Sequence, residues 1–148
     1  MEHHATIAWR RSSPGFTYET YNRAHEWRIG EQVIAASAAP DFRGDTGRLN
    51  PEEAFVAALS SCHMLTFLAV AAKRKFIPDS YLDDAVGYLE KNSQGRLAVT
   101  RVVLRPQIVW AQGISLSEED LNKLHHQAHE GCFIANSVTT DVRVEPVP

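Results

Sequence analysis

The chain has 148 residues, of which 44% are hydrophobic and 22% charged, and its formal net charge at pH 7 is −3. This length suits one domain that removes roughly two-thirds of its unfolded surface from water, and the composition is ordinary for a soluble globular protein. The slightly acidic balance, without a basic run or interleaved basic and aromatic residues, argues against nucleic acid as a partner. We therefore predict a single domain over residues 1–148.

Neither a signal peptide nor a membrane span is predicted. The first nine residues lack the basic and apolar regions of a signal peptide. The apolar run over residues 54–72 is interrupted by Ser60, Ser61, His63 and Thr66, so a buried core helix is the better interpretation. We expect a cytoplasmic protein with no membrane partner. In a reducing cytoplasm, two cysteines are more often catalytic, metal-binding or inert than a structural disulfide.

The first forty residues are predicted to form strands. Residues 16–29 are rich in aromatic and β-branched side chains, and residues 32–37 continue this pattern after a turn at Gly30. Residues 40–47 are dense in turn-forming residues and are predicted to be a loop.

A long helix with a clear start signal follows. Asn50 suits the N-cap, Pro51 the first helical position and Glu53 the third, where its carboxylate can reach back to the cap. Pro78 cannot continue a helix, so we expect the helix to end near Lys75. It would be about 37 Å long at 1.5 Å per residue. A helix this long and apolar is expected to lie at the centre of the domain.

The second half of the chain alternates strands with one more helix. Residues 81–88 and 97–110 are strand-like, a helix is predicted from Ser117 to about Gly131, and residues 138–144 form a closing strand. This order of elements predicts an α+β domain with helices packed on antiparallel sheet.

Cys62 and Cys132 are the only thiols of the chain. A cysteine is a nucleophile only as the thiolate, so its neighbours decide whether it is useful. Cys62 lies beside Ser60, Ser61 and His63, a polar break in an apolar helix that indicates the wall of a pocket. From this context alone, a small buried hydrophobe is an equally good interpretation of Cys62.

Charged residues elsewhere could act on Cys62. Glu52 precedes Cys62 by ten residues, about 15 Å along one helix, so the two side chains can meet only if a second subunit supplies one of them. Arg23 and His25 are two apart on a predicted strand and therefore share a face. That face is either solvated or cross-paired, or it brings a guanidinium to the Cys62 sulfur, where it would stabilise the thiolate and orient a peroxide oxygen.

The histidines support a competing hypothesis. His125 and His129 are four apart on the second predicted helix, and Cys132 is three residues further on. This spacing could bind a transition metal, with His63 or Cys62 completing the shell. The signal is weak, because ligands so close together on one helix supply at most three corners of a tetrahedron.

Several sequence strings resemble the OsmC/Ohr family of thiol-dependent peroxidases. The helix carries Asn50-Pro-Glu-Glu and then Ala57-Ala-Leu-Ser-Ser-Cys-His-Met64, as in the OsmC-like branch whose peroxidatic cysteine is followed by His-Met. Tyr21-Asn-Arg-Ala-His-Glu-Trp27 and Ala39-Pro-Asp-Phe-Arg-Gly-Asp45 fit the same branch. Cys132-Phe-Ile-Ala-Asn136 is similar to the second cysteine element of the family.

This resemblance implies a fold and a set of catalytic residues. The fold would be OsmC-like, with antiparallel sheets packed on a long central helix, in an intertwined homodimer with active sites at the subunit interface. Cys62 would be the peroxidatic cysteine and Cys132 the resolving one, assisted by Arg23 and Glu52.

The resemblance also implies an activity. An organic hydroperoxide would be reduced to an alcohol through a Cys62 sulfenic acid and then a Cys62–Cys132 disulfide, which a small lipoyl-type dithiol would reopen. No metal or organic cofactor would be needed. The side chains expected to line the substrate pocket are His25, Phe55, Leu59, His63 and Met64.

One departure and two alternatives remain. In the second cysteine element, Phe133 and Ala135 stand where the family typically has proline and serine. The alternatives are a transition-metal-binding protein that uses His125, His129 and Cys132, and a non-catalytic, stress-associated domain of the same fold.

Overall fold

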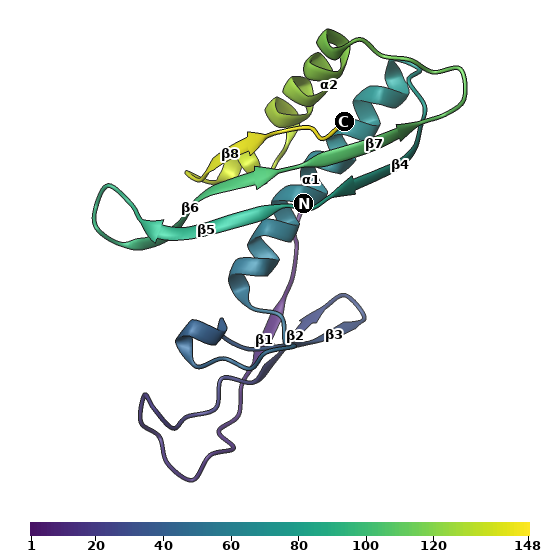
Figure 1. Cartoon of the computed structure of the whole chain (residues 1–148). Helices are drawn as coiled ribbons and strands as arrows, with labels where there is room; N and C mark the ends of the chain where they lie inside the picture. The colour runs from purple at the N-terminus through teal and green to yellow at the C-terminus, as the bar shows by residue number, and fades with distance from the viewer. The chain divides into compact units, whose positions relative to one another are not determined.

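The computed structural model describes residues 1–148 and is organised as two compact units, Met1–Ala54 and Phe55–Pro148. The boundary between the units lies inside the long helix α1 (Pro51–Lys73), which is labelled in Figure 1.

The first unit is a three-stranded antiparallel sheet followed by a short 3-10 helix. Its elements are β1 (Thr6–Ala8), β2 (His25–Ile29), β3 (Gln32–Ala36) and η1 (Pro40–Phe42). The hairpin between β2 and β3 turns at Gly30, whose φ of 58° is the left-handed conformation that such tight turns require.

The predicted strand over residues 16–29 is wrong in its first half. Only β2 is a strand, and the preceding residues form a turn in which the Thr20 and Tyr21 amides donate to the Thr17 carbonyl at 3.1 and 3.0 Å. The Thr20 hydroxyl also accepts from the Thr17 amide at 3.0 Å. Threonine hydroxyls offer the backbone local partners of this kind, which compete with the ladder of a sheet.

The start of α1 is as predicted. The Asn50 amide donates to the Glu53 carboxylate at 3.2 Å, and the Glu53 amide donates to the Asn50 side-chain oxygen at 2.9 Å. These reciprocal bonds form a capping box, which supplies partners for two amides at the helix start.

The end of α1 comes two residues earlier than predicted. The Phe76 amide donates to the Ala71 carbonyl at 3.0 Å and the Lys75 amide to the Ala72 carbonyl at 3.1 Å, while Lys75 has a φ of 61°. This is the hydrogen-bond pattern of a Schellman motif. The helix therefore ends at Lys73 through its own backbone turn, before Pro78 can interrupt it.

The second unit packs two helices with two small sheets. Its remaining elements are β4 (Pro78–Asp83), β5 (Val86–Lys91), β6 (Leu97–Leu104), β7 (Pro106–Trp110), α2 (Glu118–Gly131), η2 (Ala135–Ser137) and β8 (Asp141–Val144). One sheet pairs β4 with β7, and the other has the order β5-β6-β8. All pairs are antiparallel except β6 and β8, which run parallel.

Each of the two strands predicted between the helices is divided between the sheets. The first is broken between Asp83 and Val86, and the second at Arg105. The two breaks lie next to each other. The Asp83 carboxylate accepts a hydrogen bond from the Arg105 amide at 2.6 Å, and Asp83 is paired with Pro106 in the sheet. A side chain thus takes up a backbone amide where the ladder is interrupted.

One stripe of α1 is buried in the second unit. Leu59, His63, Phe67 and Ala71 recur every four residues, as expected for one face of a helix. Leu59 packs with Val102 and Leu104 of β6, whereas Phe67 and Ala71 pack with Leu124 and Ala128 of α2. The prediction of α1 as a core helix is thus confirmed for this face.

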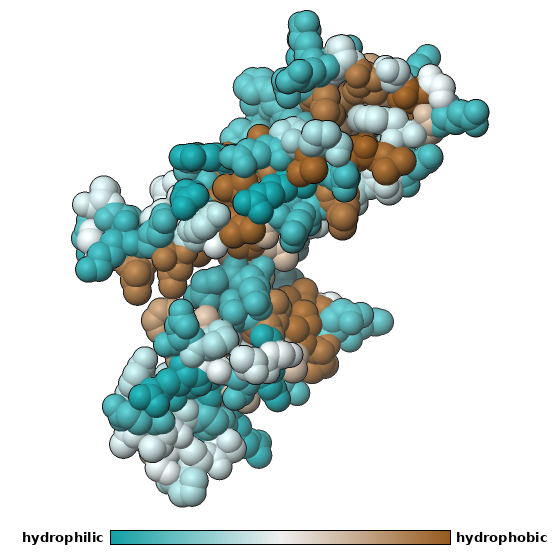
Figure 2. Space-filling model, in the orientation of Figure 1, coloured by the Kyte–Doolittle hydropathy of each residue, from teal (hydrophilic) through white to brown (hydrophobic).

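The opposite face of α1 is exposed and mostly apolar. Ala58, Ser61, Leu65, Ala69 and Ala72 are exposed, and Leu65 retains 61% of its accessible surface. Hydrophobic residues also reach the surface elsewhere, as Figure 2 shows. By length and hydropathy, α1 is the one helix that meets the criteria for a membrane span, which the core helix of a soluble protein also meets.

Candidate active site

The two cysteines lie together in the second unit, although 70 positions separate Cys62 from Cys132 in the sequence. Cys62 is in the middle of α1, and Cys132 is the C-cap of α2, with its amide directed to the His129 carbonyl at 3.3 Å. Both thiols are free, and Cys62 is close enough to Cys132 to raise the pKa of its thiol. The fold therefore assembles a dithiol.

The environments of the two thiols differ. Cys132 is 1% exposed, whereas Cys62 is half-buried. Burial raises the pKa of the Cys132 thiol, against a smaller opposing effect of the Ala135 amide, which points to its sulfur at 3.5 Å; the neighbouring Cys62 raises it further. Cys132 is therefore a protonated thiol at neutral pH, and Cys62 is the sulfur that a molecule from solution can reach.

Three polar side chains around Cys62 have partners. The Ser60 hydroxyl donates to the Asp83 carboxylate, and the Thr66 hydroxyl donates to the Cys62 carbonyl at 2.9 Å. His63 is hydrogen-bonded to His125 of α2, with 3.1 Å between Nε2 and Nδ1. The polar break in α1 is thus a set of contacts to β4 and α2 around the cysteine.

Burial lowers the pKa of His63 and of His125 to about 4. The neighbouring His129 lowers the pKa of His63 further, while Asp83 has a smaller opposing effect. The pKa of His125 is lowered further by His63. Both rings are therefore neutral at pH 7.

The residues predicted to line the pocket on α1 are placed differently from one another. Leu59 is fully buried in the core, and Phe55 packs on the same cluster. His63 is 1% exposed and bonded to His125, and Met64 is half-buried. The first two belong to packed structure in this chain, and His63 faces α2.

Arg23 belongs to the first unit and is 8% exposed. Its guanidinium lies 3.6 Å from the centre of the Tyr21 ring and donates to the carbonyl of Tyr21 at 2.5 Å and to that of Tyr18. Its Nε is buried without a partner. The structure thus holds the guanidinium against aromatic rings and leaves one donor unused.

His25 lies beside Arg23. The Trp27 indole, which can only donate, reaches His25 Nε2 at 2.9 Å, so the ring proton is on Nδ1, which donates to the Arg23 carbonyl at 2.7 Å. Arg23 and His25 both line a cavity of about 500 Å³ inside the first unit. The other lining residues are Trp9, Phe16, Tyr21, Ser37, Ala38 and Pro51.

Glu52 is half-buried in the first turn of α1. Because Glu53 and not Glu52 closes the capping box, the Glu52 carboxylate has no task in the local structure. A negative charge in this turn is favourable in any case.

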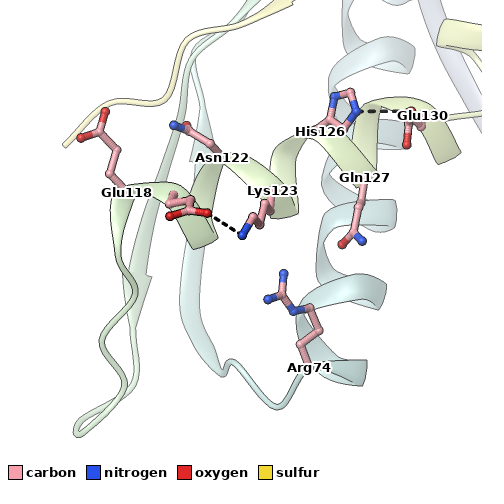
Figure 3. Close-up of a pocket in the computed structure, with 8 residues that line it drawn as sticks. Arg74, Glu118, Asn122, Lys123, His126, Gln127 and Glu130 are labelled. Atoms are coloured by element: carbon pink, nitrogen blue, oxygen red, sulfur yellow. Dashed lines mark ion pairs between the residues drawn. The ribbon is translucent and has the colours of Figure 1, made fainter.

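The structure provides no donor set for the metal hypothesis, because no three His, Cys, Asp or Glu side chains converge as ligands would. His125 is instead bonded to His63. A larger cavity of about 850 Å³ lies over the exposed face of α2 near Arg74, and Figure 3 shows it. Four of its residues form two ion pairs, Lys123 with Glu119 and His126 with Glu130, and no thiol lines it.

Sequence reasoning missed two features of this site. No pattern connects His63 with His125 or Ser60 with Asp83, because these partners are far apart in the chain and meet only through packing. The one available signal was the cost of unpaired polar residues in an apolar helix, which indicates that partners exist but not which they are.

The comparisons with known proteins agree with one another. The family model described as "OsmC-like protein" matches residues 44–147, which include Glu52 and both cysteines but not Arg23 or His25. No significant match is found among curated proteins.

Three solved structures illustrate the similarity. An OsmC-like protein of unknown function from Vibrio cholerae is 49% identical, with a TM-score of 0.95 over 99% of both chains. An organic hydroperoxide resistance protein from Legionella pneumophila is 17% identical, with a TM-score of 0.77 over 100% of this chain and 98% of the other. The organic hydroperoxide resistance protein OhrB of Bacillus subtilis is 21% identical, with a TM-score of 0.69 over 97% and 98%.

Proposed function

Because the chain belongs to the family of OsmC-like proteins, we propose that it is a cysteine-based peroxidase that reduces organic hydroperoxides to alcohols. The observation that carries this proposal is the free dithiol, one half-buried thiol beside one buried thiol. The two hydroperoxide resistance proteins share its fold and so add support, although at 17% and 21% identity they are similar to it in fold alone.

The proposed cycle begins at Cys62. Its thiolate attacks the distal oxygen of the hydroperoxide, the O–O bond breaks, and the alkoxide leaves as the alcohol after taking up a proton. Cys62 is then a sulfenic acid. The Cys132 thiol attacks this sulfur, forming the S–S bond and breaking the S–O bond, and hydroxide leaves as water with the thiol proton. A small dithiol, of the lipoyl type, reduces the disulfide and is itself oxidised.

The order of the two cysteines follows from their surroundings. Cys132 is buried and its pKa is raised, so it meets a sulfenic acid on its neighbour more readily than a peroxide from solution. Phe133, which stands where proline is typical of the family, is 79% exposed, so it does not disturb the packing of the core. Cys132 therefore suits the resolving role.

We further propose a homodimer with its active sites at the subunit interface. The exposed apolar face of α1 supports it, since such a face favours contact with another apolar surface. In the dimer, Arg23 and Glu52 would reach Cys62 of the other subunit, with Glu52 holding the guanidinium by a bidentate pair. The buried Arg23 Nε and the unoccupied Glu52 carboxylate are groups that such a pairing would satisfy. A cytoplasmic location is part of the proposal.

A thiol titration tests the function directly. Reduced protein treated with one equivalent of cumene hydroperoxide is expected to lose two free thiols and to yield one Cys62–Cys132 disulfide. Cys62→Ser should lose none, and Cys132→Ser should consume about one peroxide per site and retain a sulfenic acid that dimedone labels. An unchanged thiol count in the wild-type protein would exclude the peroxidase and favour the non-catalytic alternative.

A further inference from the structure

The two thiols belong to two helices that touch at two further places near them. One place is the His63–His125 hydrogen bond between α1 and α2. The other lies where α2 ends on α1, between Gly131 and Thr66, one residue from Cys132 and one helical turn from Cys62. Both contacts therefore bear on the separation of the two sulfurs.

The histidine contact has the geometry of an in-line hydrogen bond. The ring planes differ by 9°, and the ring centres are 5.4 Å apart. The distance between the ring centres is little more than the sum of the two ring radii and the 3.1 Å between the two nitrogens. The two centres and the two nitrogens therefore lie almost on one line. The rings are therefore edge to edge and nearly coplanar, which makes the bond sensitive to any shift of one helix along the other.

This bond is enclosed on all sides. His63 and His125 are 1% and 4% exposed, and His125 stacks on Phe67 at 4.5 Å. The titratable groups that act on the pair from outside are His129 of α2 and Asp83 of β4, and Tyr81 of β4 packs on Phe67 beside them. The outer nitrogens, His63 Nδ1 and His125 Nε2, have no partner. Because neither ring can form a replacement hydrogen bond with water, this contact holds the two helices together at this point.

The bond needs one proton and one lone pair between the rings. Two neutral rings provide this in either direction, whereas two protonated rings would present two donors and two like charges. The contact is therefore intact at neutral pH, where both pKa values of about 4 leave the rings uncharged, and is lost when both rings are protonated.

The second contact leaves little space for a side chain. A Cβ at Gly131 would lie 3.0 Å from the Thr66 Cγ2 methyl. The Thr66 hydroxyl is itself held by the Cys62 carbonyl, so the methyl cannot easily turn away. Glycine at this position allows α2 to approach α1 closely at the residue before Cys132.

We propose that the His63–His125 hydrogen bond and the Gly131–Thr66 approach together form a clamp that fixes the Cys62–Cys132 separation, with His63 and His125 as positioning residues. By fixing this separation, the clamp determines the equilibrium constant for forming the Cys62–Cys132 disulfide in exchange with thiols from solution. The inference rests on the proposed function only in taking this disulfide as the one that forms.

The test is the equilibrium of the dithiol with glutathione. Two protein thiols and one glutathione disulfide give the protein disulfide and two glutathione thiols, and alkylation with mass spectrometry measures the ratio. His125→Phe keeps the packing on Phe67 and removes the hydrogen bond, so it should lower the equilibrium constant about fivefold at pH 7, the factor for one net hydrogen bond. His126→Phe, on the exposed face of α2, is the matched control and should leave it unchanged.

The pH profile separates positioning from general stabilisation. The difference between wild type and His125→Phe should be largest at pH 7 and diminish as the pH falls through 4, because protonation of both rings removes from the wild type the bond that the variant lacks. A difference that stays constant over this range would contradict the positioning role of the histidines.

The Gly131–Thr66 contact provides a second, independent test of the clamp. Gly131→Ala should lower the equilibrium constant, and Thr66→Ser, which removes the methyl and keeps the hydroxyl, should restore it in the double variant. If wild type forms no Cys62–Cys132 disulfide, both the proposed function and the clamp are wrong. If wild type forms it and His125→Phe and Gly131→Ala match wild type, only the clamp is wrong.

Discussion

Leu59 and Leu82 carry the same side chain in opposite environments. Leu59 is fully buried between α1 and β6, whereas Leu82 keeps 65% of its surface on β4. Removing a buried leucine side chain costs its transfer free energy and leaves a cavity, while removing an exposed one costs little.

We therefore predict that Leu59→Ala lowers the free energy of unfolding by about 2 to 5 kcal/mol. Leu82→Ala should change it by no more than about 0.5 kcal/mol. Urea denaturation followed by circular dichroism measures both. Equal effects of the two substitutions would contradict the placement of Leu59 in the core.

Single residues were predictable where their roles are local or belong to a motif. Asn50 and Glu53 form the expected capping box, because both partners lie within one helical turn. The partners of Ser60 and His63 were not predictable, since Asp83 and His125 come from distant segments. The roles of Cys62 and Cys132 came from the family resemblance, and only the structure brings the two thiols together.

At the scale of elements, the packing of α1 on α2 includes two neutral histidines. Their folded-state pKa values of about 4 lie below the ordinary value of 6.5. Between these values the unfolded chain binds more protons than the folded one, so stability falls as the pH falls. The contribution is complete above pH 6.5 and lost by about pH 4.

We predict that acidification from pH 7 to pH 4.5 destabilises the wild-type protein more than His125→Phe. A depression of this size corresponds to about 3 kcal/mol for one group. Thermal unfolding at several pH values gives the difference, in which carboxylates common to both proteins cancel. A parallel decline of the two proteins would show that the histidines contribute nothing to the acid sensitivity.

Helices were predicted better than strands. Both helix starts are marked by capping residues, and α2 begins after Ser117, which accepts the Asp120 amide at 3.1 Å as expected. The strand boundaries depend on which sheet a segment joins. The breaks at Asp83 and Arg105 are set by a bond between distant residues, and the turn before β2 is set by threonine hydroxyls.

At the scale of the whole molecule, the exposed face of α1 bears on assembly. Ala58, Ser61, Leu65, Ala69 and Ala72 would allow two such helices to approach closely, and Leu65 is the largest of them. A charge at this position would be buried without a partner in the proposed dimer.

We predict that Leu65→Glu converts the proposed dimer to a monomer and reduces the proposed peroxide turnover at least tenfold, since Arg23 and Glu52 would not reach Cys62 of a second subunit. Sedimentation velocity measures the assembly. Leu82→Glu, also exposed, should remain dimeric and active. A dimeric Leu65→Glu protein would exclude this face as the interface.

The α+β class and the family of the chain were predictable from sequence, because the cysteine helix has both a start signal and a recognisable string. The division into two compact units was not, since it falls within a continuous helix that carries no composition break. The parallel pairing of β6 with β8 also has no local signal, because it depends on where the chain returns after α2.

The burial of Cys132 has a consequence for damage. Excess peroxide can carry an accessible sulfur beyond the sulfenic acid to irreversible sulfinic and sulfonic acids. With 1% of its surface exposed, Cys132 is shielded from that reaction, so in the proposed peroxidase over-oxidation would fall on Cys62 alone. In the proposed cycle, the same shield would keep the Cys132 thiol intact to capture the sulfenic acid before a second peroxide arrives. The buried sulfur would thus protect the half-buried one from permanent inactivation.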